Sequence, residues 1–314
     1  MSAPIDLRIA VATLAGAAAT LLLTPVAIRL LRARGAVERP RSDAPPHHHS
    51  KAGTVTMGGL VVVGAAICVT GLTTDLRNPA LWPALVATLG FGVIGFVDDC
   101  AKVRGRSGRG LSHRAKGIPQ LLVAAAVVLI PDPAVLGAPT EWPWPAFEFA
   151  ALVFLSNAVN LSDGIDGLAA TLVTIAAAGV GWSIYVSASD AARELAVFCA
   201  AAAGASLGFL RFNWHPARVF MGDVGSLALG AGLTTVTLTG GAATMSLAIM
   251  GVFLIESLTS AAQAIWMKAT GRDLLRMAPL HHHFELLGWS EPRIVRWFAA
   301  AALLLAAAAV LTGR

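Results

Sequence analysis

Charged residues are scarce in this chain. Asp, Glu, Lys and Arg make up only 13% of its 314 residues, while 56% are hydrophobic. Soluble domains carry about a quarter charged residues, so the deficit argues against a soluble protein and for a membrane protein. The abundance of glycine fits this class, because small residues let helices approach one another closely in lipid.

Cysteine is also rare. Cys68, Cys100 and Cys199 are widely spaced and odd in number, which gives no indication of a disulfide framework or a CxxC site. We expect them to be small buried hydrophobic residues. No Cys/His spacing indicates zinc, and the lack of a GxxxxGK[ST] loop argues against an ATPase.

Long apolar runs recur along the whole chain. A transmembrane helix needs about 20 mostly apolar residues, and ten segments are candidates, several of them short. We therefore expect an all-α polytopic membrane protein with about ten transmembrane helices in a single domain spanning residues 1–314. The candidates are Ile5–Leu31, Met57–Leu72, Ala80–Val97, Ile118–Ile130, Phe147–Leu161, Leu168–Val186, Ala192–Leu210, Val224–Leu238, Ala243–Met267 and Ile294–Leu311.

Basic residues are concentrated in alternate loops. Residues 29–56, 98–117, 211–223 and 268–293 hold eighteen of the twenty-three Lys and Arg residues. Because basic loops stay in the cytoplasm, these loops are predicted to be cytoplasmic and both termini external. Nearly every unusual polar residue lies on or beside them, so we expect an active site on the cytoplasmic loops.

Two adjacent acids, Asp98 and Asp99, follow the third apolar run. A lone acid there would be a helix cap or a solvated residue in a turn. In a pair, mutual repulsion raises the pKa of one carboxyl, which suits metal–phosphate chemistry or proton abstraction.

The stretch "NAVNLSDGIDGLAA" carries Asn157, Asn160, Asp163 and Asp166 at intervals of three. On a helix this spacing opens the four side chains on one broad side, and the two glycines are expected to unwind its end. An ordinary polar loop is the alternative. We favour a functional site, because polar groups at membrane depth are costly and usually functional.

Two further stretches carry candidate ligands. Asp223 in "FMGDVGS" is either a helix N-cap or a ligand for a hard cation such as Mg²⁺. His281, His282 and His283 are consecutive, so at most two can meet one ligand. They are either a surface run or a site for hydrogen bonding to pyrophosphate and for proton handling.

Lysines near these groups complete a pattern typical of phosphoryl transfer. Lys51, Lys102 and Lys116 supply point charges for phosphates, although positive-inside topology also explains them. Carboxylates for a metal and lysines for phosphates indicate phosphoryl transfer at the membrane face, where positioning and charge neutralisation do most of the catalysis.

The motifs together resemble the polyprenyl-phosphate N-acetylhexosamine-1-phosphate transferase superfamily over nearly the whole chain. Within it, "PLHHHFE" and "GWSEPRI" favour the muramoyl-pentapeptide branch. The other matching motifs are "HHSKAGTVTMGGL", "GFVDDCAKV", "GLSHRAKGIPQ", "NAVNLSDGIDGLA" and "FNWHPARVFMGDVGSLALG".

The resemblance implies a multi-pass protein of the bacterial plasma membrane, expected to be a homodimer. It would transfer phospho-MurNAc-pentapeptide from UDP-MurNAc-pentapeptide to undecaprenyl phosphate with Mg²⁺, releasing UMP. It makes Asp223 the Mg²⁺ ligand, Asp98 the base or nucleophile, and Asp99 a residue that positions phosphates or metal. His282 and its neighbours would contact the pyrophosphate or sugar. The implied substrate-binding residues are Lys51, Thr56, Lys102, Lys116, Asn157, Asn160, Asp163, Asp166, Asn213, His281 and His283.

Two alternatives and one departure stay open. A GlcNAc-1-phosphate transferase for another cell-wall polymer has similar motifs. A cation-coupled secondary transporter also carries membrane carboxylates, but here no repeat is visible and the acids lie at helix ends on one side. Val55 stands where the family usually has proline, and we expect it to loosen the turn before Thr56.

Overall fold

The computed structural model describes residues 3–38, 51–105, 110–130, 143–187 and 189–312. This part of the chain forms twelve α-helices, and its only β-type pairing is two isolated bridges at Val55, to Val37 and to Val219. The helices are α1 (Ile5–Ala33), α2 (Gly59–Thr73), α3 (Leu81–Arg104), α4 (His113–Leu129), α6 (Trp144–Leu161), α7 (Leu168–Ser187), α8 (Glu194–Asn213), α9 (Asp223–Thr239), α10 (Ala243–Ile249), α11 (Gly251–Thr270), α12 (Leu280–Leu286) and α13 (Glu291–Thr312).

The all-α membrane fold expected from the sequence is confirmed. Each of the ten apolar segments coincides with a helix, except that the ninth is split into α10 and α11, which meet at an angle of 67°. Six described helices are long and apolar enough to cross a membrane, or seven if α10 and α11 form one broken span. α2, α4 and α9 are shorter, with 15, 17 and 17 residues. The number of crossings and the orientation of the termini stay predictions.

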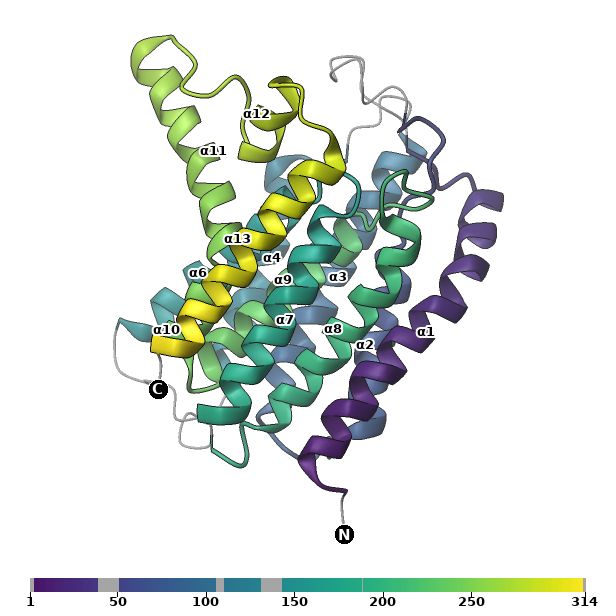
Figure 1. Cartoon of the computed structure of the whole chain (residues 1–314), viewed down its shortest axis with the longest axis vertical. Helices are drawn as coiled ribbons and strands as arrows, with labels where there is room; N and C mark the ends of the chain where they lie inside the picture. Colours follow the sequence, from purple (N-terminus) through teal and green to yellow (C-terminus); the bar gives the residue numbers. More distant parts are fainter. Residues whose placement is uncertain (1–2, 39–50, 106–109, 131–142, 188, 313–314) are drawn as a thin grey trace.

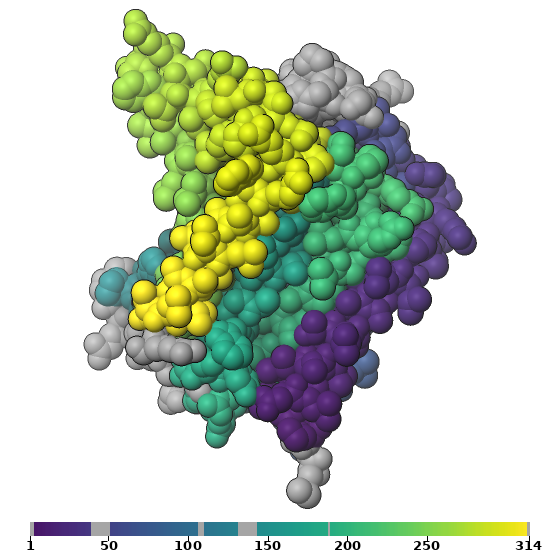
Figure 2. Space-filling model, viewed as in Figure 1, coloured from purple at the N-terminus to yellow at the C-terminus, as the bar shows by residue number. Residues whose placement is uncertain are grey.

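The bundle has a buried centre and an apolar outer surface. Every residue of α9 is buried, whereas α1 and α13 lie on the outside and cross one face of the molecule (Figures 1 and 2). α11 leaves the bundle and projects away from it beside α12 (Figure 1). The exposed Leu14, Leu22 and Leu304 lie on α1 and α13, as expected where lipid replaces water around the bundle.

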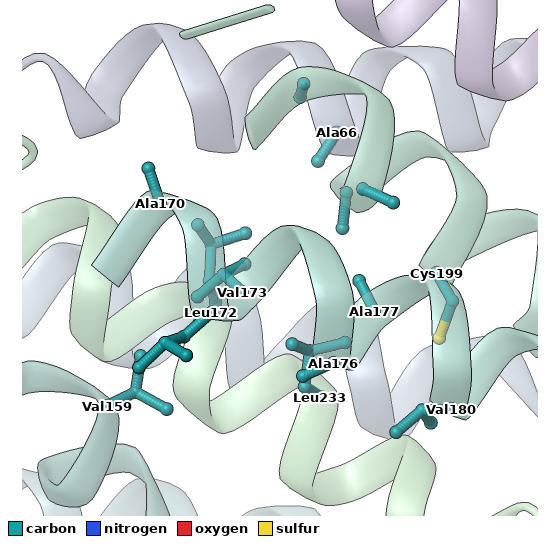
Figure 3. Close-up of a cluster of buried hydrophobic side chains, with 14 of the residues drawn as sticks. Ala66, Val159, Ala170, Leu172, Val173, Ala176, Ala177, Val180, Cys199 and Leu233 are labelled. Carbon is teal, nitrogen blue, oxygen red and sulfur yellow. The ribbon is translucent and has the colours of Figure 1, made fainter. Parts of the chain in front are cut away.

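Small residues set the spacing of the inner helices. Ala176, Ala177 and Val180 of α7 lie near Cys199 of α8 and Leu233 of α9 in the main buried cluster (Figure 3). Cys199 is therefore a buried hydrophobic residue, as expected. The same expectation is wrong for Cys68, which α2 exposes, and Cys100 is only partly buried.

One close helix contact positions the site. A Cβ atom on Gly95 of α3 would lie 2.2 Å from the carbonyl oxygen of Asp223 at the start of α9. Only glycine allows this approach of the two backbones. The contact brings the end of α3 against the beginning of α9.

Candidate active site

Three buried carboxylates meet where α3 ends and α9 begins. Asp98 and Asp99 belong to α3, which continues to Arg104 instead of ending near Val97 as expected. Asp223 is the first residue of α9. The side chains are 3%, 2% and 12% exposed, and one oxygen from each lies within 4.8 Å of the others. Such a set of oxygen donors suits a hard divalent cation.

Two lysines offset this negative charge. The Lys102 ammonium lies 2.9 Å from Asp98 Oδ2, 3.4 Å from Asp99 Oδ1 and 2.6 Å from Asp223 Oδ1. The Lys116 ammonium contacts Asp223 Oδ2 and lies 3.9 Å from Asp98 Oδ2. Three carboxylates and two ammonium groups form one compact network, so both lysines are tied to the acids.

The backbone also fixes the carboxylates. Asp99 accepts hydrogen bonds from the backbone N–H groups of Asp223 (3.2 Å) and Val224 (3.0 Å) at the start of α9. These N–H groups have no partner within the helix, and a carboxylate is favoured there. Asp98 Oδ1 accepts a hydrogen bond from Leu111 N–H at 2.7 Å. Asp99 is therefore an anchor for α9, while Asp98 keeps one oxygen toward the lysines.

The Asn157–Asp166 segment does not form one polar helical face, and that expectation is wrong. α6 ends at Leu161, so only the two asparagines are helical. Asn157 pairs with Gln120 of α4 through its amide N–H (2.8 Å). Asn160 donates to Ser226 Oγ at 2.9 Å. Its Oδ1 accepts from the Lys116 ammonium at 3.5 Å. Of the four residues, Asn160 lies beside the carboxylate cluster.

The two acids of this segment point in different directions. Asp163 accepts a hydrogen bond from Gly222 N–H at 3.1 Å, next to the carboxylate cluster. Burial raises its pKa well above the ordinary value, and the charges of Asp223 and Asp99 add to the effect. Gly167 has φ 79°, which turns the chain from α6 into α7 as expected from glycine.

Asp166 belongs to a second polar cluster, around Lys51. The Lys51 ammonium lies 2.9 Å from both Asp166 Oδ1 and Glu291 Oε2. His215 Nδ1 lies 3.0 Å from Asp166 Oδ2, and Glu291 Oε2 accepts from Asp166 N–H at 2.7 Å. Burial opposes ionisation of Asp166, but Lys51 and the hydrogen bonds hold its pKa below the usual range.

His215 and Glu291 were missed by the sequence reasoning. Both are polar residues inside the motifs "NWHPA" and "GWSEP", and their place in these motifs is the sequence feature that indicates a role in the site. The residues Asp166, His215 and Glu291 form the second group of potential metal ligands among the described residues, but the Lys51 ammonium pairs with two of them. The first group is paired in the same way, because Lys102 contacts all three of its acids.

Thr56 and Asn213 help to hold the loops that connect the two clusters. Thr56 is buried, and its N–H donates to Ala36 O at 3.0 Å. Asn213 Nδ2 donates to Val219 O at 2.9 Å. Val55 is fully buried and its carbonyl accepts from Phe220 N–H at 2.8 Å. The turn before Thr56 is thus paired with the 219–221 segment rather than loosened.

Two of the three histidines face the same place, because a Cβ atom on Gly164 would lie 2.4 Å from His281 Nε2 and 3.2 Å from His282 Nε2. His281 is fully buried and pairs with Glu256, and His282 Nδ1 lies 2.5 Å from Glu285 Oε2. His283 Nδ1 accepts a hydrogen bond from Arg276 N–H at 3.1 Å. The prediction that at most two of them meet one ligand therefore agrees with this geometry.

The fold and the site define a multi-pass helical membrane protein with a buried cluster of carboxylates and lysines at the end of a membrane-spanning helix. Residues 81–241, which contain the carboxylate cluster, match the model of glycosyl transferase family 4. The chain is also 37% identical to the phospho-N-acetylmuramoyl-pentapeptide-transferase of Thermodesulfovibrio yellowstonii, over 93% of this chain and 89% of that protein. The chain belongs to glycosyl transferase family 4.

Proposed function

We propose that this chain transfers phospho-MurNAc-pentapeptide from UDP-MurNAc-pentapeptide to undecaprenyl phosphate. An oxygen of the lipid phosphate attacks the sugar-bearing phosphorus of the donor, and the bond to UMP breaks. The products are undecaprenyl-diphospho-MurNAc-pentapeptide and UMP. The name of the bacterial relative supports this substrate pair. The reaction assigns the chain, a multi-pass membrane protein, to the bacterial plasma membrane.

The observation that carries the proposal is the buried cluster of Asp98, Asp99 and Asp223 with its two lysines. A lipid-linked phosphate stays at the membrane interface. The soluble donor must therefore reach it there, where a membrane-spanning helix ends. The cluster lies at the end of α3, one of the helices long enough to span. Positioning and charge neutralisation, which these groups supply, are what phosphoryl transfer requires.

The carboxylates fit Mg²⁺, which takes oxygen ligands and shares its remaining positions with water and phosphate oxygens. Asp223 would hold the ion, because both oxygens of Asp99 are engaged by the backbone of α9. When bound, Mg²⁺ neutralises charge on the donor diphosphate. Lys102 and Lys116 then lie where they can attract both anionic substrates.

The remaining roles follow from position. Asp98 takes the proton of the lipid phosphate, because one of its oxygens faces the lysines while the other is fixed by Leu111. Lys51 and the groups around it bind the nucleotide part of the donor. The homodimer stays a prediction.

The experiment measures UMP release by purified protein in detergent with undecaprenyl phosphate and Mg²⁺. UDP-MurNAc-pentapeptide and UDP-GlcNAc are compared as donors. Turnover with the pentapeptide donor alone supports the proposal. Turnover with UDP-GlcNAc assigns the chain to another branch of the superfamily, and no turnover with either donor refutes the proposed reaction.

A further inference from the structure

Backbone donors already hold half of the carboxylate oxygens in the Asp98–Asp99–Asp223 cluster. Asp99 Oδ1 accepts a hydrogen bond from the N–H of Asp223, and Asp99 Oδ2 accepts one from the N–H of Val224. Asp98 Oδ1 accepts from the N–H of Leu111 at 2.7 Å. A cation that binds at this cluster therefore has to use the three remaining oxygens, Asp98 Oδ2 and the two of Asp223.

Lys102 holds two of these three oxygens. Its ammonium lies 2.9 Å from Asp98 Oδ2 and 2.6 Å from Asp223 Oδ1. The third oxygen, Asp223 Oδ2, is in contact with Lys116, which also donates to Asn160 Oδ1 at 3.5 Å. The side chain of Lys102 is 36% exposed and that of Lys116 only 20%. Among the described residues, Lys102 makes its ion pairs with the acids of the cluster alone, so it can leave them for solvent without breaking any other.

A divalent cation and this ammonium compete for the same oxygens. Mg²⁺ takes its oxygen ligands at about 2.1 Å, so an ion on Asp223 Oδ1 and the Lys102 ammonium would be at most about 4.7 Å apart. Positive charges at this distance repel each other. The ammonium either stays and repels the ion, or leaves and gives up its contacts with the acids. Both lower the affinity of the cluster for metal.

We propose that Lys102 is an internal counter-ion of the metal site, which neutralises the acids on its own and is displaced from them by the divalent cation. The displaced ammonium stays tethered at the end of α3, where it can contact a phosphate of a substrate. Metal binding thus makes the lysine charge available to the phosphates. The inference rests on the proposed function for the identity of the substrate, but the competition between Lys102 and the metal does not.

Lys102→Met tests the competition, because it removes the charge and keeps the length of the side chain. Mg²⁺ alone is the probe, without donor or lipid phosphate. Its affinity follows from the rise in thermal midpoint of the purified protein over a range of Mg²⁺ concentrations. We expect Lys102→Met to bind Mg²⁺ at least about tenfold more tightly than the wild type, since a divalent and a univalent charge about 4.7 Å apart repel each other by that factor even at the dielectric constant of water.

The sign of the change decides the outcome. A lysine that only helps to hold the acids in place predicts weaker Mg²⁺ binding when it is removed. Unchanged or weaker binding in Lys102→Met therefore overturns the proposal. A thermal midpoint that Mg²⁺ raises in neither the wild type nor the variant overturns it as well.

Two control variants separate charge from other effects. Lys102→Arg keeps the positive charge, so its Mg²⁺ affinity should stay close to that of the wild type. Tightening as large as in Lys102→Met would show that packing sets the affinity, and it would overturn the proposal. Lys268→Met makes the same chemical change at an exposed position in the last turn of α11, which projects away from the bundle (Figure 1), and should leave Mg²⁺ affinity unchanged.

A second measurement uses the wild type alone and does not depend on the folding of a variant. An amine-reactive reagent labels the lysines with Mg²⁺ or with EDTA, and mass spectrometry reads the extent of labelling at each position. An ammonium paired with three carboxylates is protected from the reagent. Displacement by the cation should thus raise the labelling of Lys102 and leave that of Lys268 unchanged. Labelling of Lys102 that falls or stays constant with Mg²⁺ overturns the proposal.

The test of the competition is separate from the test of the proposed function. Under that function, Lys102→Met should release UMP more slowly than the wild type although it binds Mg²⁺ more tightly, because the charge for the phosphates is lost. A wild type that turns over neither donor refutes the proposed function. The Mg²⁺ titrations and the labelling use no donor, so they still decide whether Lys102 competes with the metal.

Discussion

Replacing Asp223 with Asn is the most direct test of the carboxylate cluster. The substitution keeps the shape of the side chain and removes one negative charge from a site with three carboxylates and two ammonium groups. A cation held among oxygens that lie within 4.8 Å of one another interacts with each carboxylate at short range. One unit charge pair about 4 Å apart is worth about 4 kcal/mol at an effective dielectric constant of about 20.

A loss of that size corresponds to about a thousandfold weaker metal affinity. UMP release at a Mg²⁺ concentration that saturates the wild type is therefore expected to be abolished in Asp223→Asn. The fold should persist, because Lys102 keeps its contacts with Asp98 and Asp99. Asp75→Asn is the matched control, since Asp75 is exposed and pairs only with the nearby Arg77 on the surface.

Two measurements decide the outcome. UMP release is followed over a range of Mg²⁺ concentrations, and the rise in thermal midpoint caused by Mg²⁺ gives a measure of metal binding that does not depend on turnover. Near-wild-type turnover of Asp223→Asn at ordinary Mg²⁺ would refute the metal assignment. A marked fall in the thermal midpoint measured without Mg²⁺ would instead show that Asp223 stabilises the fold.

Three other predictions follow from single contacts. Lys51→Ala should weaken donor binding about tenfold in a competition assay, and unchanged affinity would leave Lys51 a topology residue. Gly222→Ala should lower the thermal midpoint. Its backbone (φ 75°, ψ 171°) lies in a region essentially restricted to glycine, which costs other residues about 1–3 kcal/mol, and the new Cβ would lie 2.6 Å from Asp99 Oδ2. Gly64→Ala, in open space, is its control. Asp166 has a lowered pKa, so its pairing with Lys51 contributes stability above its ordinary pKa of 3.8 that is lost as the pH falls through the lowered value. Lys51 has a raised pKa, so its contribution is present below 10.5 and lost as the pH rises through the raised value. The difference in unfolding free energy between wild type and Lys51→Met should thus be flat from about pH 5 to 10, and a maximum at acidic pH would contradict the pairing.

The helices were largely predictable, because an apolar run long enough to cross a bilayer has few alternatives to a helix. Their interruptions were not. The run Ala243–Met267 contains no proline, and its break at Met250 depends on packing, in which Gly251 lies close to Leu305 of α13. The end of α3 was placed seven residues early, since the ion pair of Asp98 with Lys102 extends the helix past the apolar run.

The residues of the candidate site could be predicted from the sequence, but the contacts between them could not. Asp98, Asp99 and Asp223 were singled out and do lie together. Lys51 was grouped with the phosphate-binding lysines, but its partner Glu291 is 240 residues away, and no local spacing indicates such a contact. Glu256 carried a readable signal, one acid within the apolar run of α11, but that signal did not identify its partner, His281 of α12.

Close backbone packing is what allows three like charges to stay together. Repulsion among the carboxylates favours separation of α3 from α9, and the lysines offset only part of it. The contact of Gly95 with the backbone of Asp223 opposes that separation. Gly59 of α2, where a Cβ would lie 2.4 Å from Gly225, packs a third helix equally closely against α9. Three helices are thus held at distances that no larger residue permits. The glycines that mark this chain as a membrane protein are therefore also the residues that bring its acids within reach of one cation.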